Sequence, residues 1–80
     1  MLKIAKLTKL DPEKVINRAS NFFGKGGWGL DEKGRNQFCI SFEGGGGHVT
    51  ISIVDQEEHC EVTADTREFE HPVRQFLEKI

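Results

Sequence analysis

Apolar and polar residues alternate on both sides of four consecutive glycines, and this pattern constrains the fold more than any other feature. The run is Gly44–Gly47. Around it, every second residue is apolar: Phe38, Ile40, Phe42, Val49, Ile51 and Ile53. A two-residue period is typical of a strand with one buried face. The same period returns at Cys60, Val62 and Ala64. Residues 37–64 therefore predict a three-strand antiparallel meander joined by two short turns.

The two turns also predict a register, because a slip of one residue would expose the apolar side chains. A first turn centred on Gly45–Gly46 pairs Glu43 with His48. A second turn centred on Gln56–Glu57 pairs His48 with Asp65. The predicted buried rows are Phe42–Val49–Ala64, Ile40–Ile51–Val62 and Phe38–Ile53–Cys60.

Upstream of the meander, the pattern predicts a strand followed by a helix. Residues 2–10 fit either a strand or a helix, and a strand from Leu2 to Leu7 is favoured. Asp11 and Pro12 are typical of a helix start, and Gly24 of a left-handed helix end. Between them lies an apolar stripe of helical spacing: Val15, Ile16, Ala19, Phe22 and Phe23.

The remaining segments predict a short strand, a turn and a final helix. Trp28 and Leu30 fit a short strand that closes the core edge, and residues 31–35 fit a turn into the meander. Pro72 marks the first turn of a second helix. Its apolar residues recur at helical spacing: Val73, Phe76, Leu77 and Ile80.

The predicted order is β-α-β-β-β-β-α, which is an α+β fold. We expect a single domain over residues 1–80, with one antiparallel sheet of four to five strands and two helices on one face. This element order resembles one repeat of the TATA-box-binding protein fold and, more loosely, the helix-grip fold. The resemblance covers most of the chain but concerns element order only, so it implies an architecture and no activity.

Composition limits the classes of function. A chain of 80 residues buries only about 60–65% of its unfolded surface, so the core is thin. Residues 1–40 hold eight Lys or Arg and four Asp or Glu, a balance of +4. Residues 41–80 hold three and nine, a balance of −6. The net charge of −2 gives no general reason to expect nucleic acid or an anionic membrane as a partner.

Targeting and redox features indicate a cytoplasmic protein. No apolar run approaches the roughly 18 residues of a membrane span, and no secretory signal pattern is visible. In the predicted register, Cys39 and Cys60 point to opposite faces of non-neighbouring strands. A disulfide between them is therefore not expected, which agrees with a reducing compartment.

The predicted polar face of the sheet contains one candidate site. Glu43, His48 and Asp65 fall in one row, where an imidazole between two carboxylates could bind a divalent metal. The alternative is an ordinary surface histidine paired with acids. No other metal ligand set and no cofactor site is expected.

Three other features favour structural interpretations. Gly44–Gly47 leads into a strand, whereas a phosphate-binding loop leads into a helix, so a hairpin turn is favoured. Gly24–Gly27 follows a helix end and is favoured as a loop. Cys39 could be a nucleophile, but the predicted neighbour Glu61 would disfavour its thiolate, so an ordinary thiol is favoured.

We therefore expect a small intracellular protein-association module, most simply a homodimer or an accessory domain; the sequence favours the absence of enzymatic activity without excluding it. The routes would be contact through the Ser/Thr-rich sheet face or strand addition at an edge. The alternative is a small-ligand or divalent-metal binder that uses the polar face around His48. Nucleic-acid binding by the sheet is disfavoured, because the predicted face carries neither basic nor stacking side chains.

Overall fold

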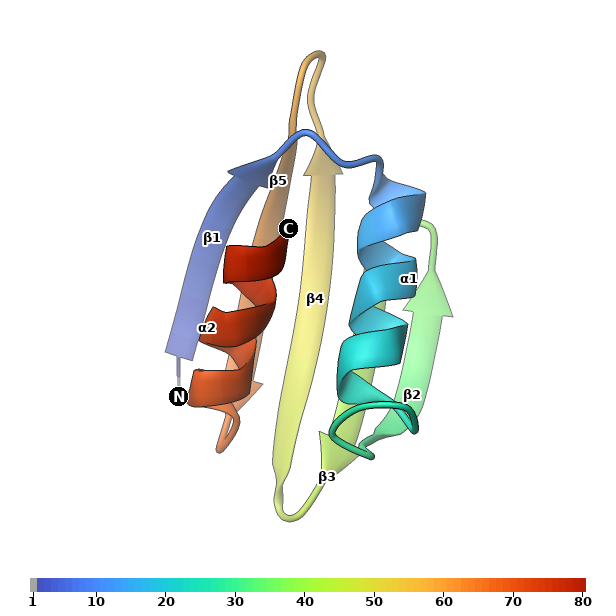
Figure 1. Cartoon of the computed structure of the whole chain (residues 1–80), viewed down its shortest axis with the longest axis vertical. Helices are drawn as coiled ribbons and strands as arrows, with labels where there is room; N and C mark the ends of the chain where they lie inside the picture. Colours follow the sequence, from blue (N-terminus) through green and yellow to red (C-terminus); the bar gives the residue numbers. More distant parts are fainter. Residues whose placement is uncertain (1) are drawn as a thin grey trace.

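The computed structural model describes residues 2–80 and confirms the predicted element order (Figure 1). The elements are β1 (Leu2–Thr8), α1 (Pro12–Phe23), β2 (Asp31–Asn36), β3 (Cys39–Gly44), β4 (Gly47–Asp55), β5 (Cys60–Arg67) and α2 (Glu70–Lys79). The five strands form one antiparallel sheet in the order β1-β5-β4-β3-β2. The chain is thus an α+β fold in which the N-terminal strand pairs with the last strand.

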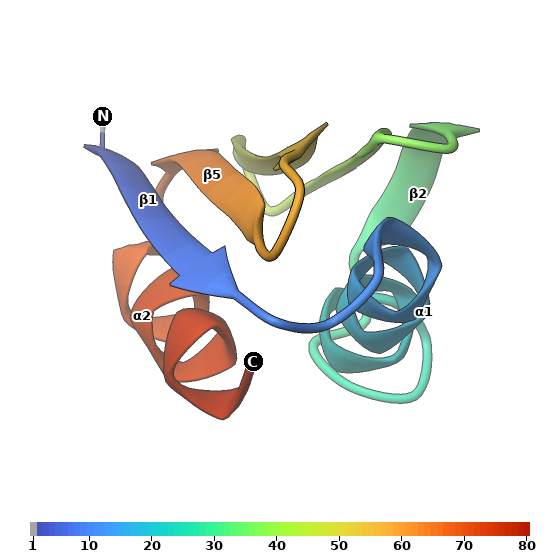
Figure 2. The same ribbon diagram turned by 90° about the horizontal axis from the view of Figure 1, so that it is seen from above.

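The molecule has two layers, with both helices on the same side of the sheet (Figure 2). α1 contacts β3 and β4, and α2 contacts β5. The core between the layers contains fully buried side chains from both helices and the three central strands: Val15, Ala19, Phe23, Ile40, Phe42, Val49, Ile51, Val62, Ala64 and Val73. The opposite face of the sheet is not covered by any described element, and it is called the open face below.

The helices form where the sequence predicts them, and aromatic residues join them to the sheet. The Phe23 ring lies 5.5 Å from the ring of Phe42 on β3 and 5.3 Å from that of Phe76 on α2, measured between centroids. Such pairs contribute about 0.5–1.5 kcal/mol each beyond the burial of their area. The predicted left-handed end at Gly24 was wrong, because its φ is −80° and its N–H donates to the Ser20 carbonyl.

The predicted strand at the N-terminus is confirmed as β1. Leu2 and Ile4 point toward the helices, and two further side chains on this face attach the strand to α2. Lys6 Nζ donates to the Leu77 carbonyl, and Thr8 Oγ1 donates to the Ile80 carbonyl at 2.7 Å. These bonds tie β1 to the end of α2.

The glycine run forms the predicted β3–β4 turn. Gly44 pairs with Gly47, and Gly45 and Gly46 have φ values of 55° and 82°. Two consecutive positive φ values are those of a type I′ turn, whose twist matches that of the flanking strands. The predicted pairs of Glu43 with His48 and of Ile40 with Ile51 are confirmed.

The predicted β4–β5 register was wrong by two residues. Asp55 pairs with Cys60, leaving a four-residue loop in which the Gln56 N–H donates to the His59 carbonyl. A two-residue turn at Gln56–Glu57 would need positive φ values that Gln and Glu adopt at a cost, whereas a longer loop does not. The shift is even, so the apolar face stays inward. The observed core rows are Phe42–Val49–Thr66, Ile40–Ile51–Ala64 and Ile53–Val62.

The second strand and the start of the third were also misplaced by the sequence pattern. The charged segment predicted as a turn is β2, an edge strand whose six residues are all exposed and which has a bulge between Glu32 and Gly34. Trp28, predicted in the core, is 48% exposed in the loop before it. Phe38, also predicted in the core, lies in the β2–β3 turn and is 44% exposed, with its N–H donating to Asn36 Oδ1 at 2.9 Å.

Candidate functional site

The open face is the side of the sheet that both helices leave uncovered, and polar side chains occupy most of it. Strand alternation and register assign these residues to it: Lys3, Ala5, Leu7, Asp31, Asn36, Cys39, Ser41, Glu43, His48, Thr50, Ser52, Val54, Glu61, Thr63, Asp65 and Arg67. None of these side chains is aromatic except the imidazole of His48. Most charged groups lie toward one end of the face, Glu61 lies at the other end, and short neutral side chains fill the middle.

One row across the strands concentrates the charge. Arg67 on β5 pairs with His48 on β4, His48 pairs with Glu43 on β3, and Glu43 pairs with Asp31 on β2. The sequence-derived register left Arg67 out of this row and left the face without any Lys or Arg. That expectation was wrong, because the two-residue shift aligns Arg67 with His48, and the β1–β5 register places Lys3 beside Asp65.

The structure brings two of the three predicted metal ligands into contact. His48 Nε2 lies 3.7 Å from Asp65 Oδ1 across a diagonal of the β4–β5 pair, with side-chain exposures of 32% and 42%. An ion pair this exposed contributes at most about 1 kcal/mol when the histidine is protonated. Glu43 is the cross-strand partner of His48 on the other side. Within residues 2–80, no group of three or more His, Cys, Asp and Glu side chains is arranged to hold a metal ion.

The middle of the open face is neutral and short. Thr63, Ser52 and Cys39 follow one another across β5, β4 and β3. The Cys39 Sγ lies 3.8 Å from the Ser52 hydroxyl oxygen. Glu61 pairs with Val54 instead of Ser52, and His59 lies in the β4–β5 loop. Among residues 2–80, the thiol of Cys39 therefore has a hydroxyl neighbour and no contact with a base that would make it a nucleophile.

A shallow hollow of about 710 Å³ surrounds the charged row on the open face. Its lining is mostly polar and comes from β2, β3, β4, the glycine turn and the end of β5: Asp31, Lys33, Ser41, Phe42, Glu43, Gly44, Gly46, Gly47, His48, Thr50 and Arg67. Both signs of charge are present in this lining. A ligand that fits here chemically would be small and polar, with donors and acceptors on one side.

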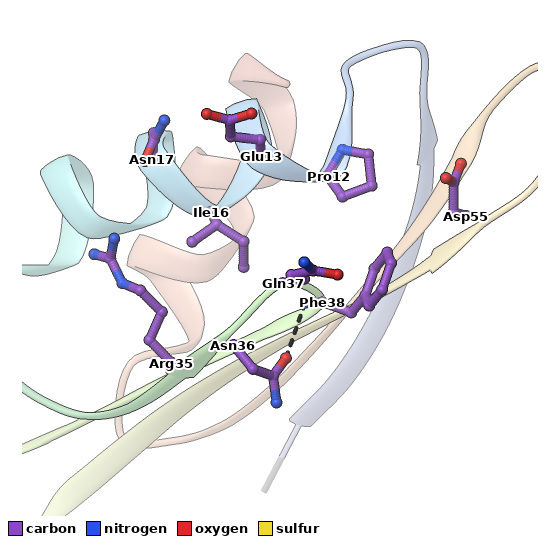
Figure 3. A pocket seen from close by; sticks show the side chains of 9 residues that line it. All are labelled: Pro12, Glu13, Ile16, Asn17, Arg35, Asn36, Gln37, Phe38 and Asp55. Atoms are coloured by element: carbon purple, nitrogen blue, oxygen red, sulfur yellow. Dashed lines mark hydrogen bonds between the residues drawn. The ribbon is translucent and has the colours of Figure 1, made fainter.

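A second hollow, of about 620 Å³, lies on the helix side between α1 and the β2–β3 turn (Figure 3). Ile16 and the exposed ring of Phe38 are its main apolar contributors. Arg35, also in its lining, makes two hydrogen bonds to the Glu32 carboxylate, at 2.9 and 3.1 Å. Because this guanidinium is already paired, the hollow presents no free strong cation from that residue. Sequence patterning missed this hollow, since it assigned Phe38 to the core.

Cys60 is a buried thiol on the helix face of the sheet. Burial raises its pKa above the ordinary value of 9.0, and a hydrogen bond from its Sγ to Asp55 Oδ1, at 3.6 Å, raises the pKa further. Both cysteines are free, and they lie on strands that are not neighbours. The prediction that they do not form a disulfide with each other is confirmed.

No protein-family model matches the chain, and no curated protein matches its sequence. In the described part of the chain, neither helix has the length and apolar character needed to cross a membrane. Any proposal about function therefore depends on the open face and on the hollows.

Proposed function

We propose that this protein is a small association module that binds another protein through the open face, most simply a second copy of itself. The observation that carries the proposal is the surface character of this face. A whole side of the sheet lacks a covering layer, and its centre consists of short, uncharged side chains. Short side chains let a second surface approach closely, and charges at one end can orient it.

The arrangement of charge around the face supports the same proposal. The basic N-terminal half of the sequence supplies β1 and β2, which are the two edges, and the acidic half supplies β4 and β5 in the centre. Inside the sheet, the open face carries Glu43 on β3 and Glu61 and Asp65 on β5, whereas the edge strands carry Lys3, Asp31 and Lys33. Charge of this pattern restricts how a partner can dock, which is a property of specific interfaces.

Sedimentation velocity across micromolar to millimolar concentration tests the homodimer form. We expect a mass that rises with concentration, and a Ser52→Arg variant that stays monomeric, because Ser52 lies at the centre of the open face on β4. Asn17→Arg is the matched control, since Asn17 is exposed on α1 on the other side of the molecule. A wild-type monomer over the whole range would rule out self-association.

Two further parts of the proposal concern setting and nucleic acid. We propose a reducing compartment such as the cytoplasm, because two unpaired cysteines would be liabilities elsewhere. The element order similar to one TATA-box-binding protein repeat would suggest nucleic acid on the sheet. The composition of the open face argues against that: Asp31, Glu43, Glu61 and Asp65 outnumber Lys3 and Arg67, and no aromatic ring other than an imidazole is available for stacking.

The hollow around His48 favours a second candidate function, the binding of a small polar ligand. Its divalent-metal form would need Glu43, His48 and Asp65 to converge on one ion, which would require side-chain movement. Titration with zinc or manganese, followed by the NMR signals of the His48 imidazole, tests it. Signals that do not change at high metal excess would eliminate the metal form.

A further inference from the structure

We infer that the open face pairs with the open face of a second copy about a twofold axis running along β4, with Arg67 of each copy against Glu43 of the other. This inference rests on the proposed association function and specifies its partner and geometry. A symmetric dimer requires a surface that is complementary to itself. The residues of the open face meet this requirement in one orientation.

Sheet order determines which strands meet. β4 is the central strand of the order β1-β5-β4-β3-β2. Consider two open faces stacked about a twofold axis that lies in the interface and runs parallel to β4. This axis lays β5 of one copy over β3 of the other, and β1 over β2. It also places each cross-strand row of one copy over the same row of the other. Arg67 and Glu43 lie in the same row, on β5 and β3, on either side of His48. The axis therefore superposes Arg67 of one copy on Glu43 of the other, twice.

The charges at these two positions lack partners in the monomer. Among the described residues, neither Arg67 nor Glu43 takes part in a salt bridge, whereas the neighbouring Asp65 lies against His48. Glu43 also lies directly opposite Asp31, and like charges at opposed positions of a sheet destabilise it. A guanidinium from the second copy would relieve this repulsion between carboxylates.

The same axis accounts for one of the exposed apolar residues at the other end of the face, Val54, whereas Leu7 lies in the same cross-strand row on β1. Val54 on β4 is 55% exposed, and an axis along β4 places it against Val54 of the second copy. Between Val54 and the charged row, the residues on the axis are Ser52 and Thr50, which are small enough for the sheets to approach. The dimer as a whole then has one apolar contact at one end and two ion pairs at the other.

A twofold axis across the strands is the main alternative, and it fits less well. It would put Arg67 over Glu61 of the second copy and Val54 over His48. The repulsion between Glu43 and Asp31 would remain, and an exposed apolar side chain would face an imidazole. The two orientations differ in which carboxylate meets Arg67, and this difference can be tested.

The size of the face sets the expected strength. Five strands about 4.8 Å apart, each contributing about seven residues at 3.3 Å, project about 550 Å² per copy. Two faces then bury about 1,100 Å², which is near the lower limit for a specific interface. We therefore expect a weak dimer, with a dissociation constant in the micromolar range or above.

Charge exchange measured by sedimentation equilibrium tests the geometry. The variants are Arg67→Glu, Glu43→Arg and the two together, with circular dichroism to check that each one folds. Each single change should weaken the dimer by about tenfold or more, because it places like charges in contact, and the double change should restore most of the affinity. Arg74→Glu, on the exposed side of α2, is the control and should leave the dimer unchanged.

The outcomes separate this inference from the proposed function. A wild-type dimer that both single changes weaken and the double change restores supports the geometry. A wild-type dimer that is insensitive to these changes, or that is restored by Arg67→Glu with Glu61→Arg, overturns the geometry and leaves self-association standing. A wild-type protein that remains monomeric overturns both the geometry and the homodimer.

Discussion

Gly47 occupies a position where a single added carbon should cost measurable stability. It is the last residue of the four-glycine run, and its φ is not in the left-handed region, so alanine can adopt its backbone conformation. A Cβ at this position would lie 2.3 Å from the Arg67 carbonyl oxygen, 2.7 Å from Glu68 Cβ and 2.9 Å from the Phe69 ring. The connection from β5 to α2 packs directly on this glycine.

The expected magnitude follows from what must move. The closest atom belongs to the backbone of β5, and Glu68 already has a φ of 77°, which leaves the connection little room to shift. Overpacking of this kind costs about 1–3 kcal/mol, and alanine returns up to about 1 kcal/mol by restricting the unfolded chain. Gly47→Ala should therefore lower the free energy of unfolding by about 1–2 kcal/mol. This corresponds to a Tm about 4–16 °C lower for a domain of this size.

Gly44→Ala is the matched control, because Gly44 is paired with Gly47 across the same turn. Its Cβ would meet Leu30 Cδ2 at 2.9 Å, which is the end of a side chain that can change rotamer. The cost should stay below about 1 kcal/mol. Thermal and urea unfolding, followed by far-UV circular dichroism, measures both variants. If Gly47→Ala melts at the same temperature as Gly44→Ala, or higher, the packing argument is refuted.

Four further predictions concern the core, the exposed ring of Phe38 and the cysteines. Phe23→Ala should lower the unfolding free energy by about 3–5 kcal/mol in urea titrations, because Phe23 is fully buried; an effect below about 1 kcal/mol would contradict its central role. Phe38→Ser, by contrast, should change that free energy by less than about 1 kcal/mol, and a larger loss would return Phe38 to the core. A thiol reagent should modify Cys39 in the folded protein but Cys60 only on unfolding, and equal rates would show that Cys60 is accessible. Since burial raises the pKa of Cys60 in the folded state, stability should fall as pH rises above 9.0, and Cys60→Ala should reduce this loss in alkaline unfolding measurements.

The outcome at the two hairpins shows which part of the fold the sequence can predict. Alternation assigns residues to a face, and the positive φ values of Gly45 and Gly46 fix the pairing next to them. In the β4–β5 loop no residue favours a tight turn, so the alternation of apolar residues was the only guide to how β4 pairs with β5. A period of two cannot distinguish registers that differ by two residues, and the prediction failed by that amount.

The same limit explains which part of the candidate site was predicted. Glu43 and His48 flank the glycine turn, and their pairing was predicted correctly. Arg67 was missed because the shorter loop ended the predicted third strand at Asp65. β2 was missed for a different reason, since its charged sequence carries no apolar alternation and its strand conformation follows from pairing with β3. Tertiary contact, not local preference, determines such an edge strand.

The attachment of β1 to the far end of the sequence has a consequence for synthesis and folding. β1 pairs only with β5, and its side chains bond to carbonyls 71 and 72 residues away. While the chain leaves the ribosome, β1 is made first but has no strand to pair with until β5 has emerged. Contacts of such long sequence separation slow folding, because a large loop must close before they form. We therefore expect the sheet to be completed only after β5 has emerged, with β1 the last strand to join it.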